Sequence, residues 1–127
     1  MKVAVIGSRG LTVDNLEDFL PICTSELVSG GARGVDSSAA RYAKENGIKI
    51  KEFLPEYEKY GRGAPLKRNL LIIDYADLVL AFWDGTSRGT KFVIDNCKKR
   101  GKEVKVFISD GYGGYEEFSD LQLNLPF

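Results

Sequence analysis

The length and charge balance of the chain limit what it can be. Its 127 residues are enough for one domain with a core of its own and too few for two. Because 18 basic residues are matched by 18 acidic ones, no overall electrostatic field would draw the protein to nucleic acid or to a membrane surface. The composition therefore argues against nucleic acid as a partner and predicts no membrane association.

Residues suited to metal binding are scarce. The sequence has no histidine, which removes imidazole as a base, an acid or a metal ligand. Cys23 and Cys97 lie in apolar patterns and do not form a CxxC pair, so we expect buried thiols in a reducing cytoplasm, with no metal and no cofactor. The opening MKVAVIG is typical of a strand and not of a signal peptide or membrane span.

Apolar patterns in the first half of the chain predict alternating strands and helices. Strands are expected at residues 3–6, 25–29 and 48–54. A first helix is expected over residues 14–23, with an inward face formed by Leu16, Phe19 and Leu20. A second helix ends at Gly47 and has an inward face formed by Val35, Ala39, Tyr42 and Ala43.

The second half continues the alternation. The segment PEYEKYGRGAP predicts a long surface loop, after which Pro65 can open a helix with a buried stripe of Leu66, Leu70 and Ile73. Strands are expected at 77–83 and 104–108. The helix between these two strands has an inward face formed by Thr90, Val93, Ile94 and Cys97. Residues 109–127 show no clear periodicity and are expected to form a tail packed back on the domain.

This alternation predicts an α/β fold. We expect a single Rossmann-like domain over residues 1–127, with a core at about 1–108 and the tail at 109–127. It would be a three-layer sandwich with a mostly parallel sheet in strand order 3-2-1-4-5. In that order the chain reverses between strands one and four, and ligands bind at the carboxyl ends of the strands there.

Three strand ends carry the same kind of glycine corner. GSRG follows the first strand, SGGARGVD the second and DGTSRGT the fourth, and the predicted strand order makes them neighbours. Glycine lets backbone N–H groups approach a ligand, and two of the corners lead into helix N-termini, which favour phosphate. Five of the seven arginines fall in these corners or in and beside the PEYEKYGRGAP loop, where their guanidinium groups could bind oxyanions: Arg9, Arg33, Arg62, Arg68 and Arg88.

Structural interpretations of the same residues stay open. Glycine also serves turn geometry alone, and neither a GxGxxG fingerprint nor a GxxxxGK[ST] loop is present. Asp36 could contact a ribose hydroxyl or cap its helix, and Asp84 could simply form a turn. Hydroxyls that could bind phosphate or cap a helix are those of Ser8, Ser37 and Thr90. Trp83 and Tyr60 could stack on a base or belong to the core.

Taken in order, the motifs GSR, VSGGARGVD, PLKRN and AFWDGTSRGT resemble the YspA-type branch of the SLOG superfamily. These are Rossmann-like nucleotide-binding domains named after the Smf/DprA and LOG proteins, and the resemblance runs from about residue 3 to 108. It implies a pocket for a nucleotide or nucleotide-derived molecule at the strand ends. The residues expected to bind this ligand, from the motifs and the loops together, are Gly7, Ser8, Arg9, Gly30, Gly31, Arg33, Gly34, Asp36, Arg68, Asn69, Asp84, Gly85, Ser87, Gly89 and Thr90.

The resemblance leaves three functions open. The first is a nucleotide-binding or nucleotide-sensing domain, and a homo-oligomer is compatible with it. The second is hydrolysis of an N-glycosidic bond in a nucleotide, as in LOG enzymes, whose PGGxGTxxE motif supplies a glutamate; here Val93 stands at that position, leaving Asp36 and Asp84 as candidate catalytic carboxylates. The third is DprA-like binding of single-stranded DNA, against which the zero net charge argues.

Overall fold

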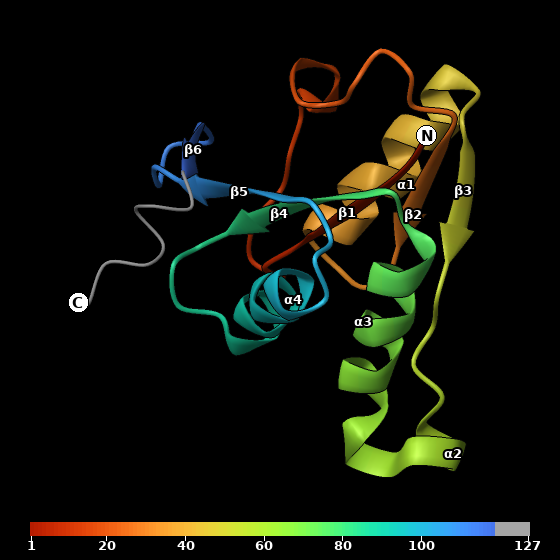
Figure 1. Ribbon diagram of the computed structural model, residues 1–127. Coiled ribbons are helices and arrows are strands. Elements are labelled where there is room, and N and C mark those ends of the chain that lie inside the picture. Colours follow the sequence, from red (N-terminus) through yellow and green to blue (C-terminus); the bar gives the residue numbers. More distant parts are fainter. Residues whose placement is uncertain (119–127) are drawn as a thin grey trace.

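A single mixed sheet forms the centre of the computed structural model, which describes residues 1–118 (Figure 1). The strands lie in the order β3-β2-β1-β4-β5-β6. Their bounds are β1 Lys2–Gly7, β2 Glu26–Ser29, β3 Lys49–Glu52, β4 Leu78–Trp83, β5 Val104–Ser109 and β6 Tyr115–Phe118. Strands β1 to β5 pair in parallel, and β6 runs antiparallel to β5. The predicted α/β fold and strand order are confirmed, with one strand added.

Helices cover both faces of the sheet. Helix α1 (Val35–Asn46) packs on one face with η1 (Leu16–Asp18), while α3 (Ala64–Tyr75) and α4 (Arg88–Lys99) pack on the other (Figure 1). Each face has its own apolar cluster because β1 and β4, buried on both sides, send alternate residues into each. Val3 and Val5 point into the α1 layer, and Ala4 and Ile6 into the α3–α4 layer. This is the predicted three-layer arrangement.

The sixth strand was not predicted. Strand β6 pairs with β5 through a tight connection in which the Asp110 carboxylate accepts hydrogen bonds from the N–H groups of Tyr112 and Gly114. Its two central residues, Glu116 and Glu117, are exposed, so the segment lacks the apolar run that marks the buried strands. Residues 119–127 of the predicted tail lie outside the described residues.

The predicted helix over residues 14–23 is wrong. Only the single turn η1 forms, and Pro21, which has no N–H to donate, lies within the predicted span. The helical spacing indicated which side chains face the core, although no regular helix forms there. Leu16 is buried, and the Phe19 ring packs edge-to-face on the Phe82 ring with 5.2 Å between the ring centroids. Cys23 is therefore exposed, which corrects the expectation of two buried thiols. Cys97 is buried, and burial raises its pKa to about 11.

The segment before α3 is more ordered than the predicted loop. It contains the short helix α2 (Tyr57–Tyr60) and the turn η2 (Gly61–Gly63), which extend beyond the sheet (Figure 1). In α3 the buried residues include Ile72 and Ile73, whereas Leu66, predicted in the buried stripe, is 43% exposed. No helix among residues 1–118 is long and apolar enough to cross a membrane.

Candidate functional site

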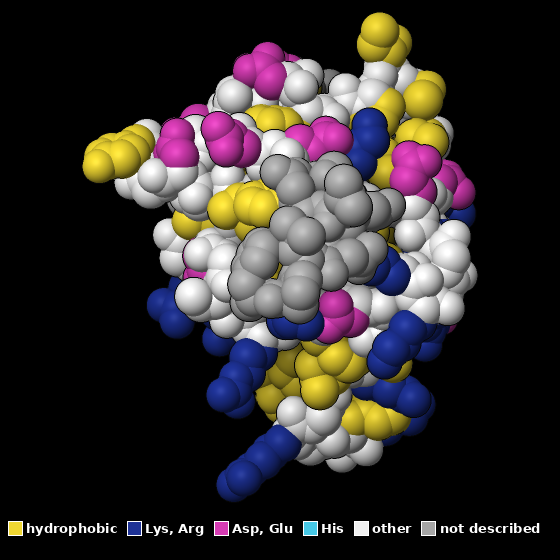
Figure 2. Space-filling model, turned by 60° about the vertical axis from the view of Figure 1, so that its left-hand side comes forward, with side chains coloured by type: hydrophobic (Ala, Val, Ile, Leu, Met, Phe, Trp, Pro, Cys, Tyr) yellow, Lys and Arg dark blue, Asp and Glu magenta, His cyan; other side chains and the backbone are white. Residues whose placement is uncertain are grey.

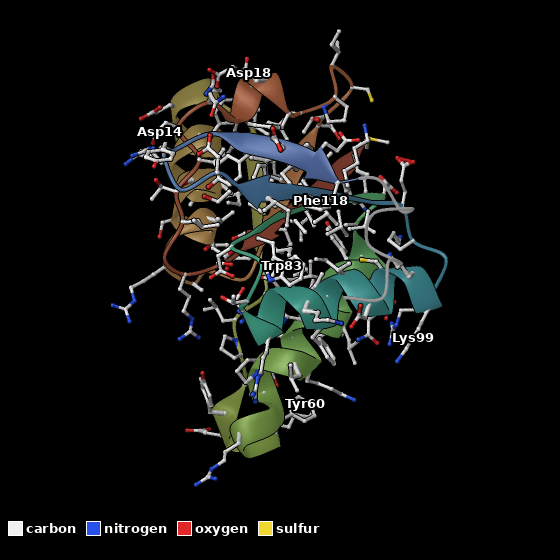
Figure 3. The ribbon with its side chains drawn as sticks, turned by 90° about the vertical axis from the view of Figure 1, so that its left-hand side faces the viewer. Asp14, Asp18, Tyr60, Trp83, Lys99 and Phe118 are labelled. Carbon is white, nitrogen blue, oxygen red and sulfur yellow. The ribbon has the colours of Figure 1, made fainter. Side chains whose placement is uncertain are left out.

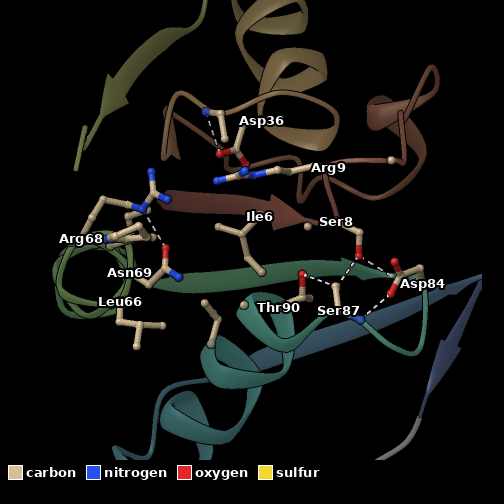
Figure 4. Close-up of a pocket in the computed structure, with 17 residues that line it drawn as sticks. Ile6, Ser8, Arg9, Asp36, Leu66, Arg68, Asn69, Asp84, Ser87 and Thr90 are labelled. Carbon is tan, nitrogen blue, oxygen red and sulfur yellow. Dashed lines mark hydrogen bonds between the residues drawn. The ribbon is translucent and has the colours of Figure 1, made fainter. Parts of the chain in front are cut away.

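A pocket of about 440 Å³ opens at the carboxyl ends of β1 and β4, where the strand order reverses. Four parts of the chain line it: the end of β1, the start of α1, the start of α3 and the N-terminus of α4 (Figure 4). Its volume falls within the range of about 300–1,000 Å³ that is usual for small-molecule sites. The sheet topology therefore produces a ligand-sized cavity where a doubly wound fold is expected to have one.

Three hydroxyl groups form a chain along the α4 side of the pocket. The hydroxyl oxygens of Ser8 and Ser87 are 2.6 Å apart, and those of Ser87 and Thr90 are 3.2 Å apart (Figure 4). Ser8 and Thr90 are buried and Ser87 is half-buried, so these bonds are partly shielded from bulk water. Ser87 is the N-cap of α4, and within residues 1–118 no side chain caps the first turn of this helix.

The first turn of α4 presents free backbone donors. The first hydrogen bond of this helix is donated by the Lys91 N–H to the Ser87 carbonyl, at 3.3 Å, so the N–H groups of Arg88, Gly89 and Thr90 precede the helical ladder. Gly89 lines the pocket, and a Cβ there would meet only open space. These donors, with the helix dipole, favour an anion at this end of the pocket.

The loop before α4 is held by Asp84. Its Oδ1 accepts from the N–H groups of Thr86, at 2.9 Å, and Ser87, at 2.7 Å. Partial burial alone would raise the pKa of Asp84, but these N–H donors and the hydroxyls of the same two residues hold it below its ordinary value. Asp84 lines the pocket as an ionised carboxylate, and one of its oxygens is used to shape the turn.

Asp36 lies on the opposite side, in the first turn of α1. It is only 7% exposed, and its Oδ2 accepts the Ala32 N–H at 3.1 Å (Figure 4). Burial raises the pKa of Asp36, and the Ala32 hydrogen bond and the Arg68 charge oppose this only in part. The two pocket carboxylates therefore have pKa values shifted in opposite directions.

Arg68 is a buried cation on the α3 side of the pocket. Its Nη1 donates to the Gly30 carbonyl at 2.6 Å, and its Nε donates to Asn69 Oδ1 at 2.8 Å. Burial lowers the pKa of Arg68, the charge of Asp36 raises it, and the like charge of Arg9 lowers it again. The bond to Arg68 engages the amide oxygen of Asn69, which leaves the amide nitrogen as its polar group toward the pocket (Figure 4).

Comparison with protein families supports the resemblance seen in the sequence. The model of the YAcAr family, the YspA, cpYpsA-related SLOG family, matches residues 1–60. The matched part of the chain, residues 1–60, is therefore similar to the YspA-related SLOG family. This similarity suggests a nucleotide-related role, either binding or modifying such a ligand. Searches of the curated proteins and of the solved structures returned no match.

The residues matched by the SLOG model include the first two glycine corners. The structure places some of the predicted ligand-binding residues at the pocket and others away from it. Of the predicted ligand-binding residues, those that line the pocket are Gly7, Ser8, Arg9, Asp36, Arg68, Asn69, Asp84, Ser87, Gly89 and Thr90. Those that do not are Gly30, Gly31, Arg33, Gly34 and Gly85. The corner after β2 contributes least, because only Asp36 and the unpredicted Ala32 reach the pocket from it.

In the corner after β2, the glycines allow close contacts within the protein. A Cβ on Gly30 would overlap the guanidinium of Arg68, and one on Gly34 would overlap the carbonyl oxygens of Arg9 and Leu11. Gly34 also has φ +76°, which L side chains rarely adopt. These two glycines therefore allow the close packing that sets the walls of the pocket.

The loop arginines do not gather at the pocket as the sequence suggested. Arg9 and Arg68 line it, whereas Arg33, Arg62 and Arg88 do not. The aromatic candidates for base stacking, Trp83 and Tyr60, also do not line it; Trp83 Nε1 instead donates to the Ser87 carbonyl at 3.0 Å. Ser37 lies outside it too, donating to the Ala32 carbonyl at 3.1 Å.

Several apolar residues of the pocket were missed as site residues. The pocket is lined by Ile6, Pro65, Leu66, Ile72 and Val93 in addition to the polar groups. Four of them fit ordinary core or helix-start patterns, so no sequence signal distinguished them. Leu66 was instead predicted in the buried stripe of its helix, whereas the structure leaves it exposed at the pocket.

Proposed function

We propose that the pocket binds a nucleotide or nucleotide-derived molecule, with a phosphate group at the N-terminus of α4. The observation that carries the proposal is the convergence there of backbone N–H groups that precede the helical ladder with the Thr90 hydroxyl, beside a glycine that leaves the approach open. The similarity of residues 1–60 to the SLOG family supports the same class of ligand.

The rest of the pocket suits the sugar and base. Asp36 offers carboxylate oxygens that can accept from hydroxyl groups, and Asn69 offers an amide nitrogen as donor. Leu66 and Ile72 supply apolar surface for a flat ring. Arg9 is exposed and lines the pocket, so its guanidinium group can pair with a negatively charged group of the ligand.

A second candidate function is cleavage of an N-glycosidic bond in the bound nucleotide. The observation that favours it is Asp36, a buried pocket carboxyl whose pKa is raised, as a group that donates a proton near neutral pH requires. Asp84 is the weaker candidate, because loop N–H groups hold it ionised. Val93 lines the pocket at the position of the LOG glutamate, so that residue cannot supply the chemistry.

Binding of single-stranded DNA has less support. Such proteins combine a basic groove with exposed aromatic side chains. The charged side chains that line this pocket are two arginines and two aspartates: Arg9, Arg68, Asp36 and Asp84. A short oligonucleotide therefore serves as a negative control in the binding test.

A thermal-shift panel tests the proposed function. A ligand that binds only the folded protein raises Tm by mass action, so the panel would include nucleoside monophosphates, ADP-ribose, NAD, cyclic nucleotides and the unphosphorylated nucleosides. We expect phosphate-bearing compounds to raise Tm and matched nucleosides to raise it much less. If nucleosides shift Tm as much as their phosphates do, the phosphate site is wrong.

A pair of arginine variants tests whether the ligand binds in the pocket. Arg9 and Arg33 are both exposed and make no hydrogen bond or ion pair with another described residue, but only Arg9 lines the pocket. We expect Arg9→Ala to weaken nucleotide binding and Arg33→Ala to leave it unchanged, with both proteins melting near the wild-type temperature. Equal binding losses in the two variants would show that the ligand lies elsewhere.

For the second function, the panel compounds are incubated at high protein concentration and analysed for free base and ribose phosphate. Release that is lost in Asp36→Asn and kept in Asp84→Asn would establish the hydrolase. No release from any bound nucleotide would leave binding alone as the function.

A further inference from the structure

Two buried side chains of opposite charge share the pocket without forming an ion pair. Arg68 is 8% exposed and Asp36 is 7% exposed, and both line the cavity. Within residues 1–118, no guanidinium nitrogen lies within 4.0 Å of a carboxylate oxygen of Asp36. The two charges still act on each other, because Arg68 works to lower the pKa of Asp36 and Asp36 works to raise that of Arg68. The two groups are therefore neighbours with a gap between them.

Each of these side chains keeps one polar atom free of protein partners. Arg68 donates through Nη1 to backbone carbonyls and through Nε to Asn69, so its Nη2 has no acceptor among residues 1–118. Asp36 accepts the Ala32 N–H on Oδ2, the Gly30 N–H acts on it more weakly, and no described residue forms a hydrogen bond to Oδ1. In the part of the chain that the structure describes, no fully buried side-chain nitrogen or oxygen lacks a partner. The two free atoms therefore open to the cavity that both residues line.

The gap between the free atoms suits a hydroxyl group better than an anion. A phosphate oxygen could accept from Arg68, but it would lie against the like charge of Asp36 and leave that carboxylate unpaired. A hydroxyl can accept from Arg68 Nη2 and donate to Asp36 Oδ1 through the same oxygen. A second, neighbouring hydroxyl would find a further donor in Asn69 Nδ2, on the same side of the pocket as Arg68 (Figure 4). Two neighbouring hydroxyls are what the cis-diol of a ribose presents.

We propose that Arg68 and Asp36 together form a ribose site that binds the cis-diol of the ligand, so that the pocket selects ribonucleotides over 2′-deoxyribonucleotides. The inference rests on the proposed function and names the sugar of its ligand. Without the 2′-hydroxyl, a buried charged group would face a ligand that offers it no partner, which costs binding energy. A site built to hydrogen-bond a hydroxyl discriminates against an analogue without it for this reason.

Calorimetric measurement of Kd for AMP and 2′-deoxy-AMP tests this selection. We expect 2′-deoxy-AMP to bind at least about tenfold more weakly, as for a lost hydrogen bond to a charged group. The titrations are run at pH 8, because burial raises the pKa of Asp36 and a higher pH keeps more of its carboxylate ionised. GMP and 2′-deoxy-GMP should give the same ratio of Kd values, since the sugar and not the base is recognised. A ratio near one in either pair would overturn the ribose site.

Variants of the two residues connect this ratio to the proposed contacts. In Asp36→Asn the ratio should fall at least about threefold, because a neutral amide binds hydroxyls more weakly than a carboxylate does. Arg68→Lys should lower the ratio as well. Because both ligands bind the same variant protein, an effect of the substitution on the fold cancels in the ratio. If Arg68→Lys does not fold, the result for Asp36→Asn decides.

Glu52→Gln is the matched control for Asp36→Asn. The Glu52 carboxylate also acts on the pKa of Asp36, but the residue is exposed and does not line the pocket. The same change from carboxylate to amide should therefore leave the ratio at its wild-type value. A wild-type ratio in Asp36→Asn, or an equal fall in Glu52→Gln, would show that the sugar is recognised by other groups and would overturn the ribose site.

The outcomes separate the ribose site from the function on which it rests. If AMP and 2′-deoxy-AMP bind equally well and Asp36→Asn changes the preference between AMP and GMP, the pair recognises a base edge. That result overturns the ribose site and leaves nucleotide binding in place. If neither AMP nor GMP binds, the ribose site fails, and if no nucleotide of the thermal-shift panel binds, the proposed function fails with it.

Discussion

The glycine corners after β2 and β4 have similar sequences but different structural roles. SGGARGVD and DGTSRGT each bring two or more glycines and an arginine to a helix N-terminus at the same edge of the sheet. After β2, the space beside Gly30 is occupied by the Arg68 side chain, and the space beside Gly34 is occupied by the backbone of the loop that follows β1. After β4, Gly89 meets open space inside the pocket. A glycine-rich corner thus indicates close approach, and only the three-dimensional arrangement decides whether protein or ligand approaches.

The corner after β2 should be the more sensitive to an added methyl group. Gly34→Ala combines strain at φ +76° with overlap against two carbonyl oxygens, so we expect a loss of about 3 kcal/mol or more in stability. Gly47→Ala is the matched control, since it has φ +64° and open space around it, and should lose only about 1 kcal/mol. Urea denaturation measures both, and equal losses would mean that the predicted overlap is relieved at no cost.

The same corner depends on Arg68. Arg68→Ala removes the donor to the Gly30 and Phe53 carbonyls, and we expect it to lower stability by about 2 kcal/mol. Exposed Arg33→Ala should stay within about 0.5 kcal/mol of wild type. Because of this loss, a binding defect in Arg68→Ala would not identify a ligand contact, and Arg9→Ala is the better probe. Wild-type stability of Arg68→Ala would show that Arg68 is not a structural residue.

The corner after β4 should respond in binding and not in stability. Gly89→Ala places a methyl group in the pocket beside the donor N–H groups, so we expect an increase of about tenfold in nucleotide Kd with an unchanged Tm. Gly63→Ala, at an open position outside the pocket, should change neither. Tight binding by Gly89→Ala would contradict the placement of phosphate at α4.

The smallest expected difference is in the pH dependence of the two aspartates. For Asp36 the folded pKa is raised, so ionisation weakens the fold as pH rises from 3.8 through that raised pKa, and Asp36→Asn should gain relative stability over this range. For Asp84 the folded pKa is lowered, so its contribution is present above 3.8 and is lost as pH falls below it. The two variants should therefore show opposite slopes in denaturation curves collected from pH 3 to pH 7. Parallel slopes would mean that the environments of the two carboxylates are alike.

Much of the fold could be predicted because β1 and β4 are short continuous apolar runs, a pattern typical of parallel strands that are covered on both faces. Strand β6 could not, since its central glutamates are exposed and its pairing depends on β5. The polar pocket residues at the ends of β1 and β4 followed from topology. The role of Gly30 did not, because it depends on Arg68, 38 residues away in the sequence.

Backbone amide shifts during a nucleotide titration would test the central claim most directly, because glycine amides from both corners are observed in one experiment. If phosphate binds at the N-terminus of α4, the N–H resonances of Gly89 and Thr90 should show the largest movements, with those of Gly31 and Gly34 changing little. Movements confined to Gly31 and Gly34, with Gly89 and Thr90 unchanged, would place the ligand at the corner after β2 and contradict the account.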